Sequence, residues 1–65
     1  MKVYGAIPSG SEWTVGKASE EYMDFVNVGD VRKFSTFEEA DRVARDIAAG
    51  KYPDCAPAGL YINMR

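Results

Sequence analysis

The chain has 65 residues, a net charge of −2 at pH 7, one cysteine and no histidine. This length predicts a single domain, residues 1–65, with one small core. Without histidine the chain lacks the commonest general base and metal ligand, so Ser-His and Cys-His catalytic pairs are excluded. The single Cys55, expected to be a small packing residue, excludes an internal disulfide and favours a reducing compartment. We therefore expect a non-enzymatic protein without a metal or a cofactor.

Two short β-prone segments open the chain. They are residues 2–7 (KVYGAI) and 12–17 (EWTVGK), and the residues between them, 8–11 (PSGS), favour a turn. Pro8 and Gly10 break the first apolar run, which is too short for a signal-peptide core or a membrane-spanning helix. We expect two strands here, and a cytoplasmic protein that does not enter a membrane.

A hairpin is predicted in residues 26–34 (VNVGDVRKF). Gly29 and Asp30 lie between two β-prone runs, and a glycine at the first central position is what a type II′ turn requires. Arg32 and Lys33 in this segment are the only adjacent basic pair, and in a strand their side chains point to opposite faces. Since no basic cluster forms, we expect no direct binding of nucleic acid.

A helix is predicted from residue 36 or 37 to residue 49. Ser35 and Thr36 each stand three residues before a glutamate, which is the spacing of a capping box, and Gly50 is placed to end the helix. Apolar residues recur at helical spacing and predict one buried stripe, made of Phe37, Ala40, Val43, Ala44, Ile47 and Ala48.

The other side of this helix carries alternating charges. Two acid–base pairs have the i,i+4 spacing and the order that favours ion pairing, Glu38 with Arg42 and Asp41 with Arg45. We interpret this side mainly as an exposed, self-neutralised surface. The alternative is a partner-binding role for Glu39, Arg42 and Asp46.

The order of these elements predicts an α+β domain. We expect a small antiparallel sheet of three to five strands with one helix packed on one face, in the order ββ(ββ)αβ, with residues 60–64 (LYINM) as the last strand. The other face of the sheet is then open. It is a candidate binding platform for some of the eight aromatic side chains, although we expect most of them in the core.

Acidic residues concentrate in one segment. Residues 12–30 contain five acids and one base, so this segment carries −4 and the rest of the chain +2. We expect an acidic edge that suits a basic surface on a protein, because carboxylates steer encounter and aromatic side chains supply the buried contact. The alternative is that these acids only keep a sheet edge soluble. The candidate partner-binding residues are Glu12, Trp13, Glu20, Glu21, Tyr22, Asp24 and Asp30.

Two resemblances bear on function. The pattern Trp13-x-Val15 followed by Phe34-x-Thr36-x-x-Glu39-Ala40, with Ala44 and Ile47, resembles small uncharacterised bacterial and phage domains in which a β-hairpin leads into a "TxxEA" helix. In its format (short, acidic, single-domain, without catalytic motifs) the sequence resembles phage-encoded inhibitors of bacterial defence, the anti-CRISPR proteins among them. Those inhibitors share no common motif, so no functional residue is carried over.

The second resemblance implies a phage-type inhibitor that acts in the cytoplasm of the host cell. Its partner would be a host defence protein, whose basic nucleic-acid-binding surface it would occupy through the acidic edge. The alternative function is a small adaptor, or a subunit of a homodimer, that binds a protein by pairing an exposed edge strand.

Overall fold

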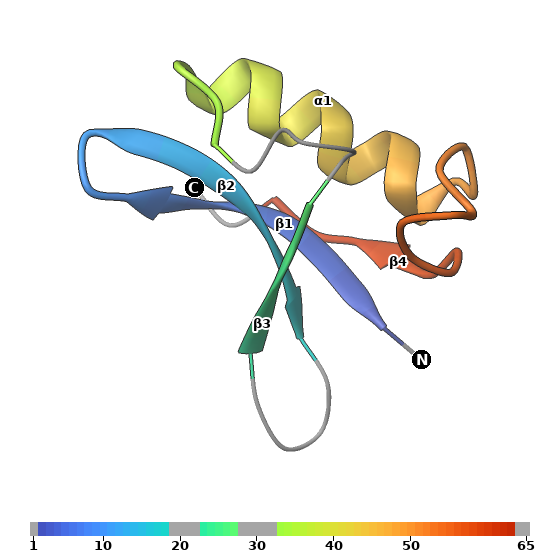
Figure 1. The fold of residues 1–65 in the computed structure, drawn as a ribbon. Coiled ribbons are helices and arrows are strands. Elements are labelled where there is room, and N and C mark those ends of the chain that lie inside the picture. Colours follow the sequence, from blue (N-terminus) through green and yellow to red (C-terminus); the bar gives the residue numbers. More distant parts are fainter. Residues whose placement is uncertain (1, 19–22, 28–32, 64–65) are drawn as a thin grey trace.

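The computed structural model describes residues 2–18, 23–27 and 33–63 (Figure 1). One helix lies across one face of a four-stranded sheet. The elements in chain order are β1 (Val3–Ser9), β2 (Glu12–Ala18), β3 (Met23–Val26), α1 (Phe37–Ala48) and β4 (Leu60–Tyr61). The predicted α+β class, the strand number and the helix on one face are confirmed.

The strands lie in the order β3-β2-β1-β4. Neighbours β1 and β2 are antiparallel, as are β2 and β3, whereas β4 runs parallel to β1. This parallel pair makes the sheet mixed, where the sequence predicted antiparallel pairing throughout. The difference arises because α1 separates β4 from the earlier strands, and a helical crossover is the usual connection that returns a chain in a parallel direction.

The turn between β1 and β2 has two central residues. The register ends at the pair Ser9 and Glu12, which leaves Gly10 and Ser11 to form the turn. Gly10 has a φ of 64°, and among the described non-glycine residues none has a positive φ. A positive φ at the first central residue alone is the pattern of a type II′ turn, which matches the right-handed twist of the strands. The turn predicted within residues 8–11 is therefore confirmed at Gly10 and Ser11, whereas Pro8 and Ser9 belong to β1.

The second predicted hairpin, residues 26–34, lies only partly within the described residues. Its turn, Gly29-Asp30, lies outside the described residues, whereas β3 precedes it and Phe34 follows it. Phe34 pairs with Trp13 of β2 through two backbone hydrogen bonds, of 2.9 Å from the Trp13 N–H and 2.6 Å from the Phe34 N–H. The chain therefore returns to the edge of β2 just before the helix and brings Lys33 next to that strand.

The helix begins and ends close to the predicted residues. Thr36 is the N-cap, and its Oγ1 accepts a hydrogen bond of 3.2 Å from the Glu39 N–H. At the other end Gly50 donates its N–H to the Ile47 carbonyl. Within the described ranges no helix has both the length and the apolar composition needed to cross a membrane.

The core lies between α1 and the sheet. Tyr4 and Val15 from the strands pack against Ala44 and Ile47 from the helix, and all four are fully buried. A second cluster, made of Ala6, Phe37 and Ala40, continues the same layer towards Trp13. The apolar stripe predicted for the helix therefore does face the sheet, with Val43 at its partly buried margin.

Asp41 departs from the prediction of a mainly exposed charged side of the helix. The residue is only 8% exposed, and its Oδ1 accepts a hydrogen bond from the Tyr61 hydroxyl. Its Oδ2 lies 3.3 Å from the Arg45 Nε, so the predicted pair with Arg45 is confirmed. Asp41 is buried because β4, which pairs with β1, brings Tyr61 alongside the helix.

Candidate functional site

Only one face of the sheet is covered by α1 (Figure 1). Side chains alternate along a strand, so the neighbours of the core residues Tyr4, Val15 and Val26 point to the opposite side. We call this side the uncovered face. Its strand residues are Val3, Gly5, Ile7 and Ser9 of β1, Glu12, Thr14, Gly16 and Ala18 of β2, Phe25 of β3 and Leu60 of β4.

The uncovered face carries the exposed large apolar side chains of the described chain. Phe25 is 49% exposed, Leu60 is 54% exposed and Ile62 is 48% exposed. Ile62 shares this face with Leu60, because its N–H continues the ladder by bonding the Tyr4 carbonyl at 2.9 Å. Among the described strand residues, Glu12 is the only charged one on this face. An apolar and charge-poor surface of this kind is typical of the core of a protein interface.

Two glycines lie between these apolar side chains. The register places Phe25 next to Gly16 and Gly16 next to Gly5, and Ile62 lies beside Gly5 on the far strand. Phe25 and Ile62 thus mark the two edges of the sheet, roughly 14 Å apart at the usual spacing of strands. Both glycines are buried, so a contact on this face is made by the exposed side chains at its two edges and not by the backbone between them.

The predicted acidic edge is described only in part. Glu12 lies on the uncovered face where β2 begins, and Asp24 lies on the other face, in β3, opposite Lys17. These two carboxylates are about 17 Å apart along the strand direction, given the rise per residue. They do not form one cluster. The other acids of the candidate set, together with its tyrosine, lie outside the described residues: Glu20, Glu21, Tyr22 and Asp30.

Trp13 contributes to the core rather than to an exposed edge. Its ring is half-buried and packs edge-on against Phe37, with ring centroids 5.2 Å apart and an interplanar angle of 78°. Of the two aromatic residues in the predicted set, Trp13 is therefore half-buried, and Tyr22 lies outside the described residues. Phe25 on the uncovered face is the exposed candidate.

Both edge strands of the sheet offer little room for strand pairing. β4 has two residues and β3 has four. On β3 the Asp24 carboxylate accepts a hydrogen bond of 2.8 Å from the Phe25 N–H, so one backbone donor of that strand already has a partner. Short edges and charged side chains are devices by which proteins discourage edge pairing. The described edges thus give little support to the adaptor alternative.

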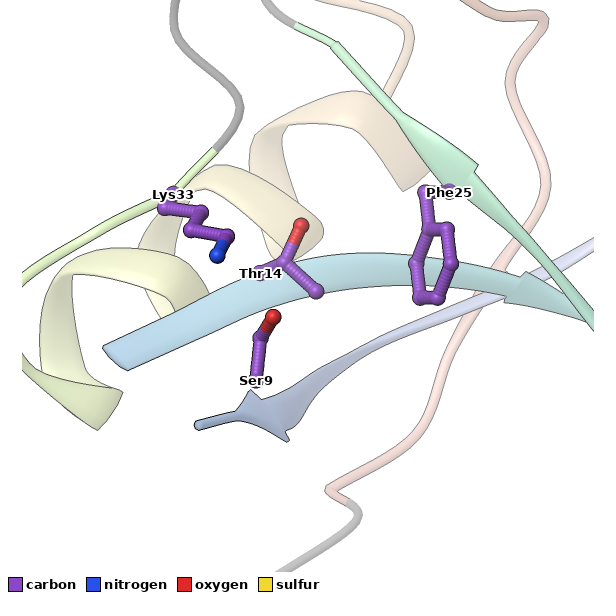
Figure 2. Close-up of a pocket in the computed structure, with 4 residues that line it drawn as sticks. All are labelled: Ser9, Thr14, Phe25 and Lys33. Carbon is purple, nitrogen blue, oxygen red and sulfur yellow. The ribbon is translucent and has the colours of Figure 1, made fainter. Parts of the chain in front are cut away.

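A pocket of about 320 Å³ lies at one end of the uncovered face (Figure 2). It is lined by Ser9, Thr14, Phe25 and Lys33, and we call it the Lys33 pocket. The Lys33 ammonium approaches the Ser9 and Thr14 hydroxyls from one side, and the Phe25 ring stands on the other. Thr14 is 3% exposed, so the pocket is backed by a buried strand residue.

A second pocket of about 490 Å³ runs along the helix. It brings together all three residues of the alternative helix site, Glu39, Arg42 and Asp46. The Asp46 carboxylate lies 3.3 Å from the Lys51 Nζ, so the charges here are mixed and partly paired. The described residues that line it are Phe34, Glu39, Arg42, Val43, Asp46 and Tyr52, and we call this the helix pocket.

Among the residues that the structure describes, two groups have shifted pKa values, and both belong to the structural framework. Burial raises the pKa of the Tyr4 phenol, whose hydroxyl donates a hydrogen bond of 2.5 Å to the Pro57 carbonyl. The hydrogen bond to Tyr61, followed by the charge of Asp41, raises the pKa of Arg45. Cys55 is exposed rather than packed as predicted, and in the described ranges no group of three His, Cys, Asp or Glu side chains is placed to hold a metal.

No protein-family model matches the chain, and searches of curated proteins and of solved structures likewise found no match. The function is therefore argued from geometry. The element order predicts the open face, but it does not identify Leu60 and Ile62, because their exposure depends on the position of β4 beside β1.

Proposed function

We propose that the protein is a non-enzymatic protein-binding module whose uncovered face makes the contact. One observation carries the proposal: Phe25, Leu60 and Ile62, each about half exposed, lie on the face that the helix leaves bare. Large apolar side chains that share an exposed face are typical of interaction sites, and a few such anchors supply most of the energy of an interface.

The charge of the chain favours a partner with a basic surface. The net charge is −2, and residues 12–30 alone carry −4. In this proposal the apolar face supplies the buried contact, while the acids of that segment steer the encounter from the rim. A basic surface of this kind is common on proteins that handle nucleic acid. The finer proposal is thus an inhibitor of the anti-CRISPR type, which covers the nucleic-acid-binding surface of a host defence protein.

The contact surface can be tested by capture from a bacterial lysate with three forms of the tagged protein. These are the wild type, the double variant Leu60→Ser/Ile62→Ser, and the helix-pocket control Glu39→Lys/Arg42→Glu, which keeps the net charge. We expect the wild type and the control to capture the same protein. The sheet-face variant should capture at least about tenfold less, because loss of one anchor can cost about 2 kcal/mol.

The opposite pattern would overturn the proposal. If the helix-pocket variant lost the partner while Leu60→Ser/Ile62→Ser retained it, the contact would lie on α1. Circular dichroism melts of all three forms establish that each is folded.

The finer proposal has its own test on the captured partner. Nucleic acid should compete with the chain, and affinity should fall as salt rises. The triple reversal Glu20→Lys/Glu21→Lys/Asp24→Lys should weaken binding far more than Glu38→Lys. Simultaneous binding of nucleic acid and of this protein would contradict the inhibitor mechanism but leave the sheet-face contact intact.

A further inference from the structure

The Lys33 pocket offers hydrogen-bond donors on one side and an aromatic wall on the other (Figure 2). The Lys33 ammonium has three N–H donors and no acceptor, and the Ser9 hydroxyl can rotate to donate. The Phe25 ring, which is 49% exposed, presents an apolar surface opposite these groups. The pocket thus has two chemically distinct halves.

The described lining of this pocket differs in charge from the chain as a whole. The chain has ten acids and eight bases, yet the described residues that line the pocket include a lysine and no carboxylate. A cation beside the Ser9 hydroxyl suits an oxyanion, since lysine binds phosphate and carboxylate groups through charge-assisted hydrogen bonds. The aromatic wall suits a flat apolar group, which can stack on or pack edge-on against the phenyl ring.

We infer that the Lys33 pocket binds a small oxyanion attached to a flat apolar group, with aryl phosphates and aryl carboxylates as the ligand class. The oxyanion lies between Lys33 and the Ser9 hydroxyl, and the ring lies against Phe25. The volume, about 320 Å³, is at the lower end of the range for small-molecule sites, so the ligand is small.

This inference goes beyond the protein-binding function and does not depend on it. The ligand binds the isolated chain, so no partner is needed for the test. Although both sites use Phe25, Lys33 belongs only to the pocket, and Leu60 and Ile62 belong only to the protein contact. Failure of one proposal is therefore distinguishable from failure of the other.

The experiment is an NMR titration of the isotope-labelled chain with phenyl phosphate. Inorganic phosphate and phenol serve as probes that each lack one half of the ligand. We expect saturable shifts at Ser9, Thr14, Phe25 and Lys33 with phenyl phosphate, and clearly weaker binding of either fragment. Added salt should weaken the binding, because the ammonium is exposed and its charge is screened.

Variants assign the binding to this pocket. Lys33→Met keeps the length of the side chain and should lower the affinity for phenyl phosphate about tenfold or more, as expected for loss of a charge-assisted interaction. Phe25→Ala should lower the affinity for phenyl phosphate but leave the affinity for inorganic phosphate unchanged. The matched control Lys51→Met, which removes an exposed lysine outside the pocket, should bind as the wild type does. Equal binding by Lys33→Met and the wild type, or shifts spread over many lysines, would overturn the inference.

Discussion

The Tyr61 hydroxyl donates a hydrogen bond to the Oδ1 of Asp41, and this contact joins the last strand to the helix. Asp41 is almost buried, so its charge needs partners, and its other oxygen lies 3.3 Å from the Arg45 Nε. The Arg45 guanidinium stands in turn over the Tyr61 ring, 5.0 Å from its centroid. These three side chains hold β4 in place, and β4 positions Leu60 on the uncovered face.

Removal of the Tyr61 hydroxyl should destabilise the fold. In Tyr61→Phe the Asp41 carboxylate loses a buried donor, and the free energy of unfolding should fall by about 1 to 3 kcal/mol. Urea denaturation of the wild type, Tyr61→Phe, Asp41→Asn and the double variant completes a thermodynamic cycle. The two substitutions should couple by about 0.5 kcal/mol or more, and strictly additive effects would show that the contact contributes nothing.

Truncation of Ile47 should remove much of the stability of the domain. The side chain is fully buried between the helix and the sheet, so Ile47→Ala should cost about 2 to 5 kcal/mol. A core of this size supplies only about 3 to 5 kcal/mol in total. The thermal melt of Ile47→Ala should therefore shift far down or disappear, whereas Arg42→Ala on the exposed side of the helix should melt close to the wild type.

Stability should fall at alkaline pH, in part through Tyr4. Burial raises the pKa of this phenol in the folded state above the unfolded value of about 10. The contribution of the neutral Tyr4 phenol to the free energy of unfolding is fully present below about pH 10. It is lost as the pH rises from there through the pKa of the folded state. Tyr4→Phe should cost about 0.5 to 1.5 kcal/mol at neutral pH, since the hydrogen bond to Pro57 is lost.

The same variant isolates the contribution of Tyr4 from those of the other groups that titrate in this range. Urea unfolding of Tyr4→Phe and the wild type between about pH 8 and pH 11 should show a shallower alkaline decline in the variant. Parallel declines would mean that the Tyr4 phenol ionises as easily in the folded protein as in the unfolded chain.

Gly59 should not tolerate a side chain. A Cβ there would lie 2.4 Å from the Lys2 carbonyl oxygen, which accepts the Leu60 N–H at 2.9 Å. Gly59→Ala should therefore push β4 away from β1, lower stability by about 1 to 3 kcal/mol and increase hydrogen exchange at Leu60. Gly10→Ala serves as the contrast. Its Cβ would meet no atom within 4 Å, so any cost there comes from the φ of 64° alone, and hydrogen exchange at Leu60 should stay as in the wild type.

The features predicted correctly from the sequence are those with local signals. The Thr36 cap and the apolar stripe depend on residues three and four positions apart, and the β1–β2 turn depends on Gly10 and its immediate neighbours. Burial of Asp41 could not be predicted in this way. It depends on Tyr61, twenty residues further on, and on the parallel pairing of β4 with β1.

The same reasoning applies to the candidate sites. Trp13 and Glu12 are adjacent in sequence, but the alternation of the strand puts them on opposite faces, and only the packing of Phe37 shows which face is buried. The Lys33 pocket combines the ends of β1 and β2 with β3 and the segment before the helix. Residues so far apart in the chain carry no shared local pattern.

The central claim is that the uncovered face contacts the protein partner, and cross-saturation NMR on the complex tests it most directly. The labelled chain is bound to the captured partner, the partner is irradiated, and the loss of methyl signal is recorded. We expect the methyl groups of Leu60 and Ile62 to lose intensity and those of Val43, which lines the helix pocket, to keep it. Attenuation at Val43 with unchanged signals at Leu60 and Ile62 would contradict the account and place the partner on the helix.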